Sequence, residues 1–229
     1  MGMRKEDVKK LQTIENNTYR RILRAPSYTA IAALRGEIGA STMHSRIVKN
    51  KTLYYKSIRE RKSKLLQEIL EMQQERNFNW IRNLRRDMGE MGWNLENIVG
   101  RDQKDIKEMF RELDEERWRR EMDVKSTFKI YRRYKGKMKE GKYYNNEESK
   151  ILFRVRSNTL KLGNRERFVG GNVGCVLCGD ELEDLEHFIM ECRRLQQERN
   201  ELVRLQRPLE EDRERVLGAV ILCDESNGM

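Results

Sequence analysis

The chain has 229 residues, of which 37% are hydrophobic and 38% are charged, and its formal net charge is +10 at pH 7. With a mean hydropathy of −0.91 and only two prolines, this composition excludes a large apolar core and favours extended helices over a compact sheet protein. No window approaches the roughly 18 consecutive apolar residues of a membrane span, and no apolar signal segment follows the N-terminus. We therefore expect a nuclear or cytoplasmic protein that is not secreted and has no membrane partner.

Apolar residues at helical spacing predict three helical segments in the first third of the chain. The first covers residues 4–24, and an Ala-rich run then forms a brief helix that Gly36 and Gly39 end. A long helix is predicted from Ser41. Its narrow apolar stripe consists of Ile47, Tyr54, Ile58, Leu65, Ile69 and Met72. That stripe can pack on a partner helix, as in a coiled coil, or on the first two helices.

A glycine-rich stretch near residues 87–93 interrupts the helical pattern, and we interpret it as a hinge or a boundary. Beyond it, the spacing of apolar residues predicts another amphipathic helix with many charged neighbours. The core positions of that helix are Ile106, Met109, Phe110, Leu113 and Trp118. These methionine and aromatic side chains are interpreted as structural.

Basic and aromatic side chains alternate in the segment that begins at Ser126. The aromatic positions are Phe128, Tyr131, Tyr134, Tyr143 and Tyr144. The basic positions that we select as nucleic-acid contacts, in and after this segment, are Lys125, Lys129, Arg132, Arg133, Lys135, Arg154, Arg156, Arg165 and Arg167. Cations can follow a phosphate backbone while exposed rings stack on bases. Some of the tyrosines must instead belong to the core, so the composition fits direct contact and a structural role alike.

The charge of the chain is unevenly distributed. Residues 1–167 carry 41 Lys and Arg against 24 Asp and Glu, whereas residues 168–229 carry 7 against 14. A basic field of this size predicts a polyanionic partner, because Lys and Arg that neutralise phosphates release condensed counterions. The alternative for any single charged run is a solvated face of mixed ion pairs.

Three cysteines and a histidine stand at C-x2-C-x8-H-x4-C spacing between Cys175 and Cys192. The chain has four cysteines and two histidines in all, so four of these six residues fall in this one stretch. The close pair with Cys178 suits a turn that aims two thiolates at one point, and Asp184 can cap a helix that carries His187. Four such ligands close a tetrahedral shell, which predicts one structural Zn²⁺.

Other interpretations of these cysteines were weighed. A redox C-x-x-C of the thioredoxin kind needs a βαβ context, which the flanking residues do not have, and small buried core cysteines are the other structural possibility. A catalytic zinc would need an open coordination position. Cys223 stands apart from the other cysteines and is interpreted as a buried small residue or a free thiol.

Several segments resemble one protein family. The order R-S-N-T-L-K-L, then C-V-L-C-G-D-E-L-E-D-L-E-H-F-I-M-E-C, then a charged helix with Arg199 resembles the C-terminal end of non-LTR (LINE-type) retrotransposon reverse-transcriptase polyproteins. The segments L-Q-T-I-E-N-N-T-Y-R-R-I-L-R-A-P and A-A-L-R-G-E-I-G-A-S-T-M-H-S-R-I resemble the region after the polymerase palm, and M-D-V-K-S-T-F-K-I-Y-R-R-Y resembles the stretch before the zinc site. The resemblance covers nearly the whole chain, and its most specific element is the CCHC arrangement.

The resemblance implies that this region grips template RNA or target DNA near the polymerase, with the zinc knuckle as part of that platform. The aromatic-x-Asp-Asp run of the palm is missing, and only 37 residues follow Cys192. The resemblance therefore implies the tail of a polymerase without the polymerase, either a truncated element copy or a segment of a longer product. The polymerase portion of the same polyprotein is then a further expected partner.

Together these patterns predict a mainly α fold, an elongated helical assembly with a small C-terminal CCHC zinc-binding module. We expect a helical thumb-like region over residues 1–88, a helical basic linker region over 89–150, and the zinc-binding module with C-terminal helices over 151–229. The predicted function is non-catalytic binding of RNA and/or DNA. The alternative is a helical protein-interaction scaffold with a structural zinc clasp. An enzyme lacks support, because no carboxylate cluster, nucleophile with its base, or phosphate-binding glycine loop stands at motif spacing.

Overall fold

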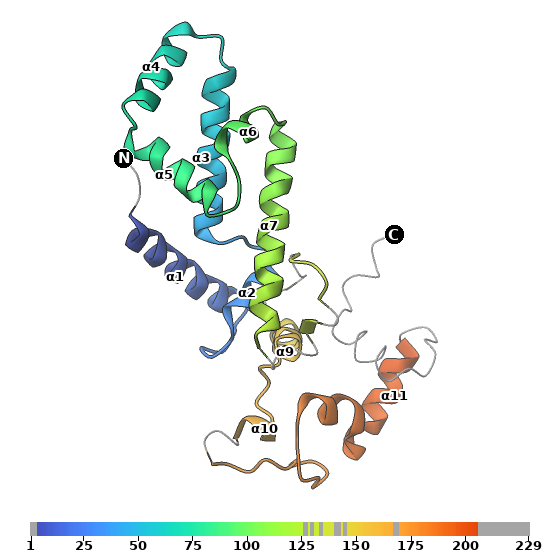
Figure 1. The fold of residues 1–229 in the computed structure, drawn as a ribbon. Helices are drawn as coiled ribbons and strands as arrows, with labels where there is room; N and C mark the ends of the chain where they lie inside the picture. Colours follow the sequence, from blue (N-terminus) through green and yellow to red (C-terminus); the bar gives the residue numbers. More distant parts are fainter. Residues whose placement is uncertain are drawn as a thin grey trace. The chain divides into compact units, whose positions relative to one another are not determined.

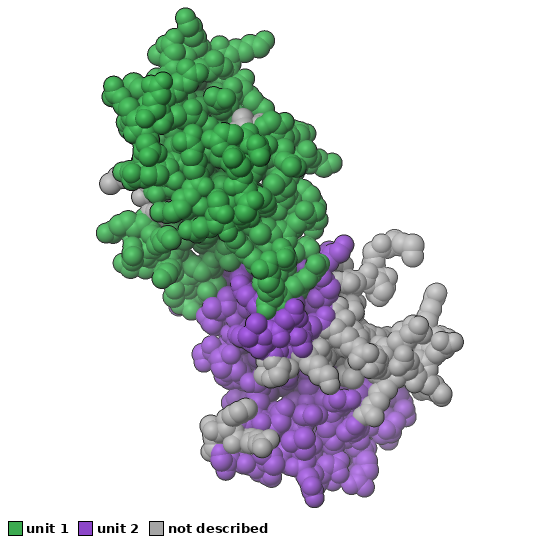
Figure 2. Space-filling model, in the orientation of Figure 1, with its two compact units in different colours: residues 1–18, 40–120 green, residues 19–39, 121–229 purple. Residues whose placement is uncertain are grey.

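The computed structural model describes residues 4–125, 128, 131–132, 135–139, 143, 146–166 and 170–205. Every regular element in these ranges is a helix, and they contain no strand (Figure 1), which confirms the prediction of a mainly α fold. The described residues form two compact units, unit 1 within residues 1–18 and 40–120, and unit 2 within residues 19–39 and 121–229 (Figure 2). The division into residues 1–88, 89–150 and 151–229 stays a prediction.

Unit 1 is built from helices that surround one apolar cluster. Its helices are α1 (Lys5–Ile22), α3 (Met43–Glu60), α4 (Lys64–Glu75), α5 (Asn79–Gly89), α6 (Leu95–Val99) and α7 (Gln103–Asp123), of which α1 and α7 end within unit 2. The buried members of the cluster are Val48, Tyr55, Leu70, Ile81, Leu84, Met88, Met91, Leu95, Ile98, Ile106 and Phe110.

The long helix predicted from Ser41 is two helices. Thr42 caps α3 by accepting the backbone N–H of Ser45 at 3.1 Å, and α3 ends where Arg61 takes an extended backbone conformation. The chain then re-enters a helix at Lys64, and α4 buries Leu70 in the same cluster as α3. The prediction of one continuous helix was therefore wrong at residues 61–63.

The face of α3 that enters the core is one residue away from the predicted stripe. Val48 and Tyr55 are buried, whereas Tyr54 is 61% exposed. Polar residues share the buried face, where the Ser45 hydroxyl donates to Asp114 at 2.8 Å and the Thr52 hydroxyl donates to the Val48 carbonyl at 2.9 Å. These satisfied polar groups interrupt the apolar pattern, which is why the periodicity selected the neighbouring stripe.

The glycine-rich stretch at residues 87–93 is a tight turn inside the core of unit 1. Gly92 has a φ of +78°, and the N–H of Trp93 donates to the Met88 carbonyl at 3.0 Å. Residues on both sides of the turn, including Met88 and Leu95, belong to one apolar cluster. The stretch therefore does not separate two compact units, contrary to the boundary interpretation.

Unit 2 contains shorter elements. They are α2 (Ile31–Ile38), α9 (Glu147–Arg156), α10 (Gly163–Glu166), a π-helix (His187–Glu191), a 3-10 turn (Arg193–Leu195) and α11 (Gln196–Leu205). A small apolar cluster of Val155, Leu162 and Leu185, with Leu160, Phe188 and Ile189 packed against it, lies beneath the predicted zinc ligands in the sequence. The C-terminal module thus has little apolar material of its own.

A buried carboxylate organises the other half of unit 2. Glu37 on α2 is fully buried, and the Tyr131 hydroxyl donates to it at 2.7 Å. The Tyr143 hydroxyl also donates to Glu37, while Lys135 Nζ lies 3.6 Å and Arg156 Nη1 lies 3.5 Å from its oxygens. Burial, followed by the negative charge of Glu37, raises the pKa of Tyr131 well above its ordinary value. The buried charge is therefore paired and hydrogen-bonded, as burial requires.

Candidate metal centre

The first two cysteines of the predicted site lie in a tight backbone turn. The Cys175 N–H donates to the Asp180 carbonyl at 2.8 Å, and the Gly179 N–H donates to the Cys175 carbonyl at 2.9 Å. Gly179 has a φ of +82°, a conformation that side chains other than glycine rarely adopt. The turn therefore brings Cys178 back beside Cys175, which is the arrangement that two ligands of one ion require.

The same turn shifts the pKa of both thiols. Burial raises the pKa of Cys175, but backbone hydrogen bonds from Cys178 and Leu177 outweigh burial and leave the pKa below its ordinary value. Burial raises the pKa of Cys178 to about 12, and its hydrogen bonds with Asp180 and Cys175 add to the rise through their side chains.

The other two ligands lie on a π-helix. Asp184 accepts the His187 N–H at 2.8 Å and so caps the turn, as predicted. The Cys192 N–H donates to the His187 carbonyl at 2.8 Å, which is the five-residue hydrogen bond of a π-helix. In an α-helix a residue five positions on would point about 140° away, because successive residues turn by about 100°. The π-turn instead places both side chains on one side.

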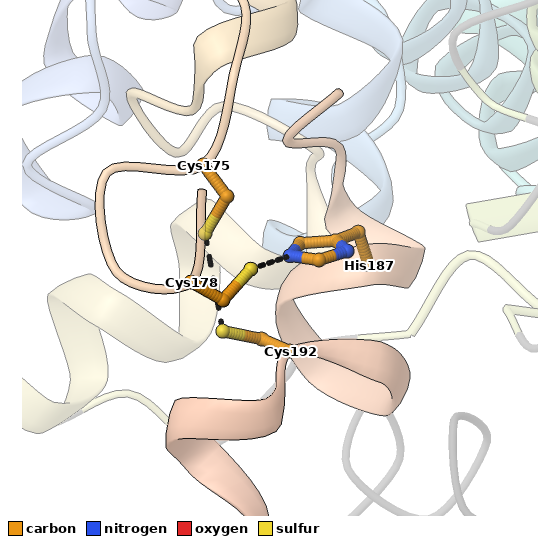
Figure 3. A group of neighbouring side chains, drawn as sticks. All are labelled: Cys175, Cys178, His187 and Cys192. Carbon is orange, nitrogen blue, oxygen red and sulfur yellow. Dashed lines mark hydrogen bonds between the residues drawn. The ribbon is translucent and has the colours of Figure 1, made fainter. Parts of the chain in front are cut away.

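The four side chains converge on one point (Figure 3). One ligand atom each from Cys175, Cys178, His187 and Cys192 lies within 4.8 Å of all the others. The Sγ atoms of Cys175 and Cys192 are 3.9 Å apart, and Cys178 Sγ is 3.3 Å from His187 Nε2. A tetrahedral ion with metal–sulfur bonds of about 2.3 Å separates its sulfurs by about 3.8 Å. The cluster can therefore hold one metal ion, and three of its four residues are buried.

The imidazole of His187 is oriented by carboxylates on its far side. Its Nδ1 lies 3.6 Å from Asp180 Oδ2 and 3.8 Å from Glu191 Oε2, while Nε2 faces the thiols. A carboxylate behind a ligating imidazole fixes the tautomer and strengthens the ligand. The two nitrogens of His187 are thus assigned to different roles by their surroundings.

Two further residues hold the turn and the π-helix in place. Glu183 is buried, accepts the Gly163 N–H at 2.8 Å, and lies 3.4 Å from Cys175 Sγ. Arg199 on α11 donates to the Cys192 carbonyl at 2.6 Å and to the Ile189 carbonyl at 3.5 Å. Sequence reasoning did not assign these contacts, because neither a buried glutamate nor a capping arginine differs in sequence from the surrounding charged residues.

The residues predicted to contact nucleic acid are placed differently from one another. Lys125 is exposed, and Arg132 donates to the Asp123 carboxylate at 3.1 Å. Arg165 lies 5.0 Å from the centre of the Tyr28 ring, and Arg154 is half-buried. Lys129, Arg133 and Arg167 lie outside the described residues.

Lys135 and Arg156 require a correction. They are 8% and 5% exposed, and both are paired with Glu37 inside unit 2. Their side chains therefore do not face nucleic acid. Two aromatic positions of the same segment, Phe128 and Tyr131, are also buried, so they belong to the core and not to a stacking surface.

None of the described helices is long and apolar enough to cross a membrane. Comparisons of the chain with models of protein families, with curated proteins and with solved structures find no match.

Proposed function

We propose that this chain binds RNA or DNA without catalysis, as a fragment of a non-LTR retrotransposon reverse transcriptase, and that one structural Zn²⁺ organises its C-terminal module. The convergence of Cys175, Cys178, His187 and Cys192 is the observation that carries the metal part of the proposal. The excess of Lys and Arg in residues 1–167 supports the nucleic-acid part.

The donor set favours zinc. Three thiols and one imidazole suit Zn²⁺, which takes sulfur and nitrogen ligands in tetrahedral geometry. With four protein ligands the shell is closed, so the ion has no position for water or substrate and its role is structural. Because the module has a small apolar cluster, the metal would supply much of the free energy that orders it.

The metal would act by ordering the module and not by attracting phosphates. Residues 168–229 carry 14 acidic against 7 basic side chains, so the field around the metal centre repels polyanions. The phosphate contacts are therefore expected upstream, where exposed basic residues such as Lys125 remain candidates.

A binding titration tests the proposal. Purified zinc-loaded protein is titrated with labelled single-stranded RNA and with duplex DNA at two salt concentrations, beside a Cys175→Ser, Cys178→Ser variant. Cys223→Ser is the matched control, because it removes a thiol that does not belong to the four-ligand group. We expect salt-sensitive binding that the double variant weakens and the control retains. Absence of binding to either probe at low salt would overturn the proposal.

A second function is favoured by the exposed face of α4. Leu65, Ile69 and Met72 follow one side of this helix and are 65%, 38% and 40% exposed. Lys64 stands at one end of the same helix and Glu75 at the other, so two copies packed antiparallel would bring opposite charges together. Under this alternative the chain self-associates, as a scaffold would.

Sedimentation equilibrium over a range of protein concentrations separates the two functions. Self-association through apolar side chains should change little with added salt, whereas nucleic-acid binding should weaken steeply. An Ile69→Lys variant that stays monomeric while the unaltered protein dimerises would favour the scaffold function. A monomer at all concentrations would exclude it.

A further inference from the structure

A pocket of about 270 Å³ in unit 1 is lined by residues of α1, α3 and α5. Each helix contributes side chains at helical spacing, for example Lys5 and Lys9 from α1, and His44 and Lys51 from α3. The volume is close to the lower end of the range for small-molecule pockets, about 300 to 1,000 Å³. The pocket is therefore of a size to take one small group and not a folded partner.

The pocket carries more positive than negative charge. It is lined by four Lys and Arg residues against two carboxylates, Asp87 and Glu90. Arg86 lies 3.1 Å from Asp87 and 3.8 Å from Glu90, and Lys5 lies 3.8 Å from Glu90. The two carboxylates are thus matched by two of the cations.

The remaining two cations are Lys9 and Lys51. In the described part of the chain, neither ammonium group has a carboxylate within 4.0 Å. Lys9 is exposed and Lys51 is half-buried, and the imidazole of His44 lines the same pocket. Two ammonium groups and an imidazole beside one pocket form a site that an anion can neutralise.

An apolar wall completes the pocket. Val8 on α1 and Ile47 on α3 line it, and both are half-buried. Ile47 belongs to the apolar stripe predicted for α3, but it is not among the buried residues of the core cluster. A ligand that suits the pocket therefore combines an anionic group with a flat apolar ring.

We infer that this pocket binds one nucleotide unit, with its phosphate against Lys9 and Lys51 and its ring against Val8 and Ile47. The inference rests on the proposed function, since it names the surface of unit 1 that would hold a nucleotide of the bound strand. It differs from the basic segment around Lys125 that the sequence favours. Two experiments separate the failure of the pocket from the failure of nucleic-acid binding.

The first experiment uses small probes and does not depend on nucleic-acid binding. The chain has only two histidines, so the His44 imidazole can be followed by proton nuclear magnetic resonance and assigned with a His44→Gln variant. AMP is expected to shift the His44 signal saturably, inorganic phosphate less strongly, and adenosine hardly at all. An AMP titration that leaves the signal unmoved, or an equal shift with adenosine, would overturn the inference.

A charge-neutralised variant makes the assignment specific. Lys9→Gln with Lys51→Gln should weaken AMP binding at least about tenfold, because it removes both unmatched charges. The matched control is Lys10→Gln with Lys49→Gln, which neutralises two lysines of the same helices that do not line the pocket. Equal weakening in both variants would contradict the inference. Far-ultraviolet circular dichroism verifies that both variants keep their helices.

The second experiment measures single-stranded RNA binding by the same variants over a range of salt. Each lost phosphate contact should reduce the salt slope by about 1, so the pocket variant should lose about 2 and the control less. If the unaltered protein binds RNA but the two variants keep the same slope, the pocket inference fails and the proposed function stands. If the unaltered protein does not bind RNA, the proposed function fails and the AMP titration alone decides the pocket.

Discussion

The backbone N–H of Cys192 donates to the carbonyl of His187 at 2.8 Å, and this one hydrogen bond gives both side chains the same direction. It makes the four intervening residues a π-turn, because the bond spans five residues and not four. The second half of the metal centre therefore depends on the number of residues between its two ligands.

Shortening this turn by one residue tests that dependence. Deletion of Met190 is expected to abolish stable zinc binding, because a turn with one residue fewer moves Cys192 away from the other three ligands. Met190→Ala keeps the spacing and should keep the metal. Zinc affinity measured by competition with a chromogenic chelator checks both variants. Retention of zinc by the deletion variant would show that the spacing is not required.

Removal of the charge behind His187 should weaken metal binding without abolishing it. In Asp180→Asn the carboxylate 3.6 Å from Nδ1 becomes neutral, and we expect zinc affinity to fall by about 10- to 100-fold. Glu181→Gln is the matched control, since Glu181 is the adjacent exposed acid and is not in contact with the imidazole. Chelator competition at constant pH measures both, and equal affinities would remove Asp180 from the centre.

Gly163 should not tolerate a side chain. A Cβ at this position would lie 2.3 Å from the carbonyl oxygen of Val173, a backbone atom that cannot move aside cheaply. Gly163→Ala is therefore expected to destabilise the module by about 1 to 3 kcal/mol, the usual cost of overpacking. Gly89→Ala serves as the control because nothing lies within 4 Å of its Cβ. Chemical denaturation of the zinc-loaded protein compares the two, and an unchanged midpoint for Gly163→Ala would contradict the packing.

The hydrogen bonds of Glu37 predict a loss of stability at alkaline pH. The pKa of Tyr131 is raised in the folded protein, so this group contributes stability in full below the ordinary tyrosine pKa of about 10. The contribution is lost as pH rises toward the folded pKa, because the unfolded chain releases the proton first. Denaturation midpoints should therefore fall from pH 9 to pH 11, and Tyr131→Phe should reduce that fall. A pH dependence identical in the variant would argue against this network.

The sequence predicted the residue types of the metal centre but not the shape of its second half. Cysteine and histidine spacing and the capping Asp184 identify the ligands, since these signals are local. The π-turn has no such signal. The pairing of Arg156 with Glu37 was equally hidden, because its two partners lie far apart in the chain and a buried arginine has the same letter as an exposed one.

Native mass spectrometry of the full chain tests the metal centre most directly. We predict one Zn²⁺ per chain in the unaltered protein and in Cys223→Ser, and none in the Cys175→Ser, Cys178→Ser variant. Removal of the ion with a chelator should lower the melting temperature of the zinc-loaded protein, because folding of the module and metal binding are coupled. A metal-free chain with unchanged thermal melting would contradict the proposal that zinc organises this module.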